Sequence, residues 1–163
     1  TFDGLRLPQH DASIVVTPHV DRMIQDLFEE EDRAREMANR LMQIARSSKA
    51  AAVAERDGLV TFLRGPMERH MHYEETALFP KLPQKGLVDE VQVARKHHDS
   101  IRTDTDQLAA ATDPEVVAQL VFDVARFMMH HTNFECDYIY PELTRAEWRA
   151  LIQETAHEHP NAG

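Results

Sequence analysis

Apolar residues recur every three or four positions along most of this chain, the spacing that places them on one face of a helix. No stretch competes with this pattern by alternating apolar and polar residues as a half-buried strand does. The pattern predicts four long amphipathic helices and a short fifth one, at about residues 17–47, 49–79, 87–110, 114–140 and 144–152. Long amphipathic helices joined by short loops favour an all-α fold, an antiparallel up-down four-helix bundle.

Turn and capping residues divide the chain into parts. Thr17 and Pro18 suit the N-cap and the first position of a helix, whereas the residues before them show no sustained period. Among these, residues 13–16 are predicted to be extended against the body of the protein. The predicted organisation is an N-terminal extension at residues 1–16, a four-helix bundle at 17–143, and a C-terminal helix and tail at 144–163.

Local signals refine the helix boundaries. Pro66 lacks a backbone donor and crowds the preceding turn, so a kink is predicted one turn before His70. Residues 80–86 are predicted to form a loop. Thr144, followed three residues later by Glu147, has the capping-box pattern that begins the short fifth helix.

The composition narrows the class of protein. A chain of 163 residues is long enough for one domain with its own core. Its single cysteine, Cys136, cannot form an intramolecular disulfide, so a reducing, cytoplasmic location is predicted. The net charge of −10 argues against nucleic acid as a partner, because that partner requires a basic surface. We expect neither a membrane span nor a signal peptide, because no apolar run is long enough.

One motif occurs twice. The first copy has His70 with Glu74 four residues later, and the second has His131 with Glu135 at the same spacing. In both copies a Pro-x-Leu sequence begins six residues after the glutamate. Positions i and i+4 share one face of a helix, so each copy aims an imidazole and a carboxylate at the same point. This spacing is typical of metal ligands, and its repetition makes chance an unlikely explanation.

Helix lengths place polar residues of four helices at one level. In an antiparallel bundle, residues at one level on successive helices lie equally far from the loop between them. The midpoints of the pairs Glu31 and His70, Glu74 and His98, and His98 and His131 fall at the three predicted connections. We therefore expect one layer of metal ligands made of Glu31, His70, Glu74, His98, His131 and Glu135.

Six nitrogen and oxygen ligands around a bundle axis suit two transition-metal ions bridged by the two motif glutamates. Iron and manganese fit such ligands, and zinc is also possible. The alternative is that these residues are polar groups at the edge of the core that satisfy one another. Burying three imidazoles and two carboxylates without a metal would be costly, which favours the metal site.

The order HxxxE, a single His, then HxxxE, together with the segment HMHYEETALFP at residues 70–80, resembles the hemerythrin-like (HHE cation-binding) domain family. The resemblance covers about residues 23–143. It implies a four-helix bundle with a non-haem, carboxylate-bridged di-iron centre that is open to dioxygen, peroxide or nitric oxide. It also implies terminal and bridging roles for the ligands: terminal for His70, His98 and His131, bridging for Glu74 and Glu135.

The chain departs from that family on its first helix, where the family has a histidine. Glu31 lies at the matching level and would make a harder, more oxidised centre through its oxygen. His19 is the competing candidate, although its midpoint with His70 falls inside the first helix. The extra histidine of the oxygen-carrying hemerythrins would fall at Ala94. Its absence favours redox chemistry or sensing over reversible oxygen carriage.

Other polar residues near the motifs receive lesser roles. Tyr73 and Tyr138 flank the motifs. They are predicted to be packing residues, with hydrogen-bond donation to a bound oxygen species as the alternative. Cys136 is predicted to point away from the metal. Three other histidines lie on different faces of their helices from the predicted ligands. They are predicted to be surface or supporting groups: His72, His97 and His130.

Two functions remain open from the sequence. The first is a di-iron protein that binds and reacts with a small oxidant, as an oxidoreductase that decomposes peroxide in oxidative stress or that handles dioxygen or nitric oxide. The second is a non-enzymatic, metal-responsive regulatory module. In that case iron or oxygen occupancy would change the contact with a protein partner or with a second copy of the chain. Peroxide turnover by iron-loaded protein distinguishes the two.

Overall fold

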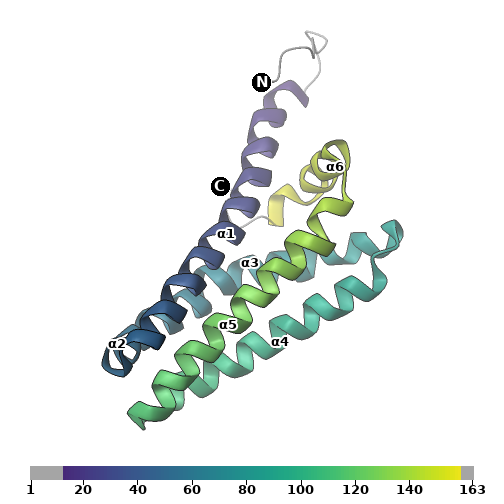
Figure 1. Ribbon diagram of the computed structural model, residues 1–163. Coiled ribbons are helices and arrows are strands. Elements are labelled where there is room, and N and C mark those ends of the chain that lie inside the picture. Colours follow the sequence, from purple (N-terminus) through teal and green to yellow (C-terminus); the bar gives the residue numbers. More distant parts are fainter. Residues whose placement is uncertain (1–12, 159–163) are drawn as a thin grey trace.

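The computed structural model describes residues 13–158, and in this part of the chain every regular element is a helix (Figure 1). The α-helices are α1 (Ser13–Ser47), α2 (Lys49–Phe62), α3 (Glu68–Tyr73), α4 (Val88–Ala110), α5 (Pro114–Tyr138) and α6 (Arg145–Thr155). Two π-helical segments, Leu63–Met67 and Glu74–Leu78, flank α3. Shorter 3-10 segments are Phe79–Lys85, Tyr140–Glu142 and Ala156–Glu158.

Capping residues explain most of the helix boundaries. The Ser48 hydroxyl accepts a hydrogen bond from the amide of Ala51 at 3.2 Å and begins α2 directly after α1. Asp113 caps α5 through the amide of Glu115. The predicted capping box of α6 is confirmed, because the Thr144 and Glu147 side chains each accept a bond from the other residue's amide.

Two predicted boundaries are wrong. α1 begins at Ser13 and not at Thr17, so residues 13–16 are helical where an extended segment was predicted. Residues 80–86, predicted as a loop, belong largely to the 3-10 segment Phe79–Lys85. Prolines are tolerated in that segment, and it ends at Gly86, whose φ of 82° is in the left-handed region that favours glycine.

The distortion predicted at Pro66 is present as the π-helical segment Leu63–Met67. Proline cannot donate the backbone hydrogen bond of an α-helix and its ring crowds the preceding turn, so a wider turn accommodates it. The chain then returns to α-helical geometry in α3, which carries His70. The helical path from Lys49 to Phe79 is therefore continuous but not uniform.

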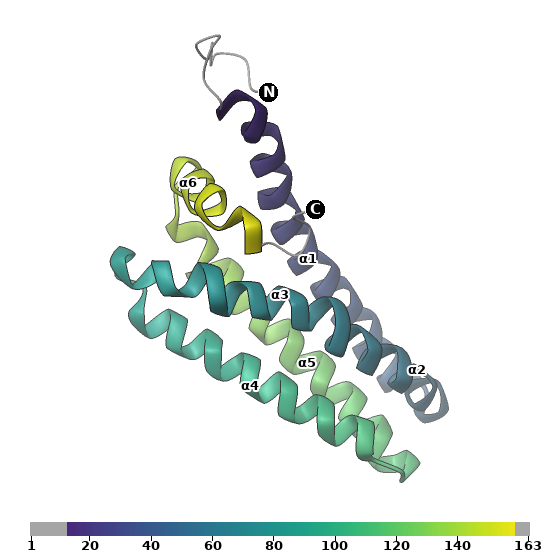
Figure 2. The same cartoon turned by 180° about the vertical axis from the view of Figure 1, so that it is seen from behind.

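Helix α5 packs against α1, α2 and α4, and α6 packs across α1 near the end of the molecule that lies away from α2. Seen from behind, α2 and α3 form one bent path beside α4 (Figure 2). Within the described residues, no helix combines the length and the apolar character needed to cross a lipid bilayer.

The buried apolar residues form two clusters, one toward α6 and one toward α2. The two clusters meet across polar gaps on three helices, between Leu27 and Ala34 on α1, between Ala94 and Ile101 on α4, and between Met128 and Ile139 at the end of α5. Glu31, His98, and His131 with Glu135 occupy these gaps and are all buried. A polar layer thus separates two half cores.

Candidate metal centre

The polar layer brings all six predicted ligands together in two overlapping groups. One group contains Glu31, His70, Glu74 and Glu135, and the other contains Glu74, His98, His131 and Glu135. In each group the potential ligand atoms lie within 4.8 Å of one another, and every member is buried. Glu74 and Glu135 belong to both groups, in the positions expected of bridging carboxylates.

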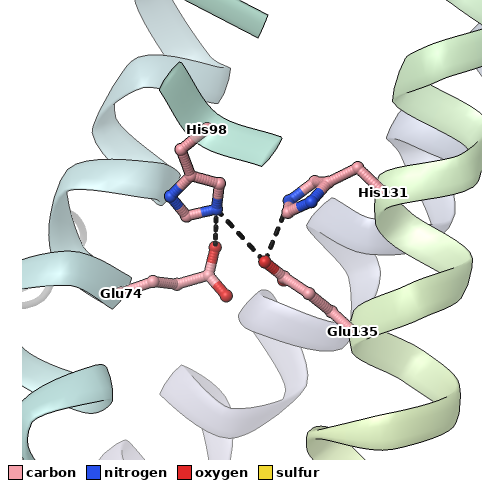
Figure 3. Close-up of side chains that lie close together, drawn as sticks. All are labelled: Glu74, His98, His131 and Glu135. Carbon is pink, nitrogen blue, oxygen red and sulfur yellow. Dashed lines mark hydrogen bonds and ion pairs between the residues drawn. The ribbon is translucent and has the colours of Figure 1, made fainter. Parts of the chain in front are cut away.

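The second group combines side chains from three segments (Figure 3). His98 Nε2 lies 3.1 Å from Glu135 Oε1 and 3.6 Å from Glu74 Oε1. His131 Nε2 lies 2.9 Å from the same Glu135 oxygen, one turn away on α5. The two imidazoles and the two carboxylates therefore point at a common centre.

The first group has more oxygen donors. His70 Nε2 lies 2.8 Å from Glu31 Oε1, which comes from α1, and 3.1 Å from Glu74 Oε1. Glu31 is only 3% exposed. His19, the competing candidate on α1, is exposed to solvent and belongs to neither group. The geometry therefore favours Glu31 over His19 at this level.

Two carboxylates missed by the sequence analysis orient two of the predicted histidine ligands. Glu30 forms a short contact with His70 Nδ1, and Glu75 lies 2.9 Å from His98 Nδ1. Burial opposes the ionisation of Glu75, but its bonds with His98 and Arg102 lower its pKa to about 2, so it stays negative. Both contacts leave Nε2 free to face the centre, the usual way of fixing a metal-binding imidazole.

A histidine plays the orienting role for the third imidazole. His97 Nδ1 lies 3.2 Å from His131 Nδ1. Burial and the nearby charge of His130 lower the pKa of His97, which favours its neutral form with one ring nitrogen able to accept a hydrogen bond. The prediction of a supporting role for His97 fits this contact, whereas His72 and His130 are exposed.

The buried charges are balanced by protons. Burial alone would lower the pKa of His70, but the charge of Glu74 helps to raise it well above 6.5. Burial and the same Glu74 charge raise the pKa of Glu135. Burial lowers the pKa of His131. Metal binding requires deprotonated ligands, so a cation that enters this layer must displace protons from it.

Unsatisfied atoms test whether a metal fits. Glu31 Oε2, Glu74 Oε1, Glu135 Oε2 and His131 Nε2 are buried and make no hydrogen bond, although Glu74 Oε1 and His131 Nε2 lie 3.1 and 2.9 Å from their ion-pair partners. Leaving such groups unpaired is costly, and metal ions bound to oxygen and nitrogen would satisfy all four. The buried histidines and glutamates therefore fit a metal site.

A third tyrosine, which the sequence analysis did not single out, donates to the layer. Tyr73 is buried and its hydroxyl lies 2.7 Å from that of Thr155, and Tyr138 is 58% exposed. Tyr140, from the 3-10 segment after α5, instead enters the layer and donates to Glu74 Oε2 at 3.1 Å. This residue directly precedes the Pro-x-Leu end of the second motif, but its direction depends on how the chain leaves α5.

Cys136 faces the guanidinium of Arg35, whose Nη2 lies 3.0 Å from Sγ. Burial is the largest influence on this thiol and raises its pKa to about 11. A thiol in this state is a poor metal ligand and a poor nucleophile.

A small cavity of about 40 Å³ lies beside the first group. Its lining includes the ligands Glu31 and His70, and the apolar side chains of Phe62, Pro66 and Met67. Pro66 is exposed, so the lining extends from the surface to the buried ligands. One water molecule needs roughly 10–15 Å³ of such space, so the cavity admits a molecule of only a few atoms.

Comparisons with known proteins agree with the ligand layer. A sequence model described as the hemerythrin HHE cation binding domain matches residues 22–143, which include all six residues of the two groups. Neither the search of curated proteins nor the search of solved structures gave a match. The matched region covers most of the 163 residues. The chain therefore belongs to the hemerythrin HHE cation-binding family.

Proposed function

We propose that this chain is a non-haem di-iron protein that binds and reacts with a small oxidant, namely dioxygen, peroxide or nitric oxide. The observation that carries the proposal is the pair of four-residue groups that share Glu74 and Glu135. The proposal takes the long helices as an antiparallel up-down bundle, which the packing of α5 against α1, α2 and α4 supports.

Each ion would have four protein ligands. Glu31 and His70 would hold one ion, His98 and His131 would hold the other, and the two motif glutamates would bridge them. Mixed nitrogen and oxygen ligands suit iron, with manganese as the nearest alternative. Bound iron would supply one-electron redox chemistry and a coordination position for a small oxygen- or nitrogen-containing molecule.

The remaining residues would prepare this position and limit access to it. Glu30 and Glu75 hold two imidazoles through their outer nitrogens, so the ligand geometry exists before the metal arrives. The cavity of about 40 Å³ beside His70 supports a diatomic molecule or hydrogen peroxide as the substrate. The lining combines apolar side chains with four ionisable ones, Glu30, Glu31, Arg33 and His70.

Iron content and oxidant consumption test the proposal together. Protein loaded anaerobically with ferrous iron should contain two ions per chain and should consume hydrogen peroxide or nitric oxide. Replacement of both bridges, in Glu74→Ala/Glu135→Ala, should abolish the paired site. His72→Ala is the matched control, because His72 is exposed on the same segment as His70.

Thermal melting gives a second readout of the same site. Binding to the folded state alone adds about 3 to 4 kcal/mol of stability at 100 to 1,000 times Kd, which corresponds to a rise in melting temperature of roughly 10 °C for a domain of this size. One ion or none per chain would refute the dinuclear site. Two ions without consumption of any oxidant would favour the regulatory module instead.

A further inference from the structure

Tyr140 belongs to the polar layer but is not one of the six predicted ligands. Its side chain is 2% exposed. The phenolic oxygen lies 3.1 Å from Glu74 Oε2, 3.4 Å from Glu31 Oε1 and 3.5 Å from His70 Nε2. It therefore contacts three of the four side chains of one metal group, Glu31, His70 and Glu74.

These distances match the spacing of donor atoms around a single ion. Oxygen and nitrogen ligands bind transition metals at about 2.0–2.2 Å, so neighbouring donors around one ion lie roughly 3 Å apart. Glu31 Oε1 and His70 Nε2 are 2.8 Å apart, and the phenolic oxygen lies slightly farther from both. A small inward movement of the ring would bring its oxygen into the same coordination sphere.

The two copies of the motif differ at this position. Phe79 stands five residues after Glu74, and Tyr140 stands five residues after Glu135. The Phe79 ring stacks on His98, with centroids 5.5 Å apart, on the side of the other metal group. The repeated chain segments therefore cover both ends of the layer with an aromatic ring, but only the ring beside Glu31 and His70 carries an oxygen.

Neighbouring aromatic rings hold Tyr140 in this orientation. Trp148 Nε1 donates to the Tyr140 carbonyl at 3.1 Å, and the Tyr140 ring makes edge contacts with Trp148 and Phe28 at centroid distances of 5.1 Å each. The ring also lines a surface cavity of about 560 Å³. The phenol thus has its oxygen in the ligand layer and stays almost fully buried.

We propose that the Tyr140 phenolic oxygen is a fifth protein ligand to the ion held by Glu31 and His70. On coordination the O–H bond breaks heterolytically, the electron pair stays on oxygen, and the proton leaves to solvent, so no electron is transferred. This inference rests on the proposed iron site for the presence of the ion. Its consequence is an unequal pair, in which the oxygen-rich position prefers a hard, trivalent ion and the position of His98 and His131 does not.

Visible absorption and resonance Raman spectra of ferric-loaded protein test the assignment. Phenolate bound to ferric iron gives an intense charge-transfer band in the visible range, and excitation in this band enhances the vibrations of the tyrosine ring. Wild type should show both signals. Tyr140→Phe should lose both and keep two ions per chain.

The chain provides close controls. Tyr140→Phe introduces the residue that the first motif has at the matching position, so the change removes one oxygen and keeps the ring. Tyr73→Phe and Tyr138→Phe remove the same oxygen elsewhere, one from a buried site and one from the surface, and both should keep the signals. Melting curves of the metal-free variants check that each one folds.

The outcomes separate this inference from the function on which it rests. A wild-type protein with two ferric ions and no phenolate signals, or a Tyr140→Phe protein that keeps them, would show that Tyr140 does not bind iron while the di-iron site stands. Signals that disappear in Tyr73→Phe or Tyr138→Phe would assign the ligand to a different tyrosine. Wild-type protein that binds no iron would overturn the di-iron proposal and the tyrosine ligand with it.

Discussion

Glu31 is a buried carboxylate between the two hydrophobic clusters. Leu27 and Ala34, one turn to either side of it on α1, are both buried in hydrophobic clusters. A carboxylate at such a position destabilises the fold unless it is paired. Its pairing with His70 at 2.8 Å leaves Oε2 without a partner, so the side chain is only half satisfied by the protein.

Substitutions at positions 31 and 19 should therefore have different effects on metal content. Glu31→Ala should lower the affinity for the ion shared with His70 by at least about 100-fold, because losing a ligand costs more than losing a group that orients a ligand. The affinity for the ion held by His98 and His131 should not change. Glu31→His should retain two ions and shift the visible spectrum toward that of a histidine-rich site. Elemental analysis and competition with a chelator measure these changes.

His19→Ala is the control for this prediction, because His19 is exposed on the same helix. It should change neither occupancy nor spectrum. Loss of one ion in His19→Ala, with Glu31→Ala indistinguishable from wild type, would mean that α1 enters the layer in another register.

The positions of the six grouped residues could be predicted because they depend on regular spacing. A repeat of four residues fixes the direction of His70 and Glu74, and equal distances from each loop fix the level of His98. Glu30 and Tyr140 could not be predicted in the same way. Glu30 lies in an acidic run that equally suits a solvated surface, and the direction of Tyr140 depends on the turn that ends α5.

At the scale of the elements, local chemistry sets most boundaries. The caps of α2, α5 and α6 involve only a few neighbouring residues, and the capping box of α6 was predicted from the sequence. The π-helical segments around α3 were not predicted. A wide turn is selected by how the whole helix packs on its neighbours, and Pro66 indicates a distortion without indicating its kind.

Two glycines provide a contrasting test of the helical path. Gly58 lies inside α2, and a Cβ there would meet no atom within 4 Å. Gly58→Ala should raise the free energy of unfolding by about 1 kcal/mol, because alanine loses less conformational entropy in a helix. Gly86→Ala should lower it by about 1 kcal/mol, because φ is 82° there and disfavours any side chain.

Urea denaturation of both variants in the same metal state measures the two effects. Both glycines are exposed, so neither change disturbs the core. A loss of stability in Gly58→Ala would show that α2 is not regular at this point. A gain in Gly86→Ala would show that the turn before α4 adopts another conformation.

At the scale of the whole molecule, α6 is joined to α1 by an ion pair across the surface. Arg149 donates to both carboxylate oxygens of Asp21, at 2.8 and 2.7 Å. Hydrogen bonding to Arg149 is the main reason that the pKa of Asp21 is lowered below 3.8. The pair links the C-terminal helix to the first helix of the bundle, and both side chains are about one-quarter exposed.

Asp21→Asn should destabilise the metal-free protein by about 1 kcal/mol at pH 7, the value of a good partly buried pair. A folded pKa below the unfolded one means that Asp21 contributes its stability above pH 3.8 and loses it as the pH falls further. The difference between wild type and variant should therefore be constant down to about pH 4 and should shrink below it. Urea denaturation at a series of pH values measures it.

The control is the ion pair between Arg64 and Asp106, whose side chains are 55% and 75% exposed. Asp106→Asn should change the free energy of unfolding by less than about 0.5 kcal/mol at pH 7. Equal effects of Asp21→Asn and Asp106→Asn would indicate that the link between α1 and α6 adds no more than an ordinary surface pair.

The division of the core into two clusters has a consequence for cooperativity. Apolar attraction acts mainly within each cluster, because a layer of carboxylates and imidazoles lies between them. In the metal-free protein, the end near α6 can then open locally while the end near α2 stays folded. Metal ions bound by residues of α1, α3, α4 and α5 would make both halves unfold together. Amide hydrogens at the two ends would exchange at separate rates without metal and through a shared global opening with it.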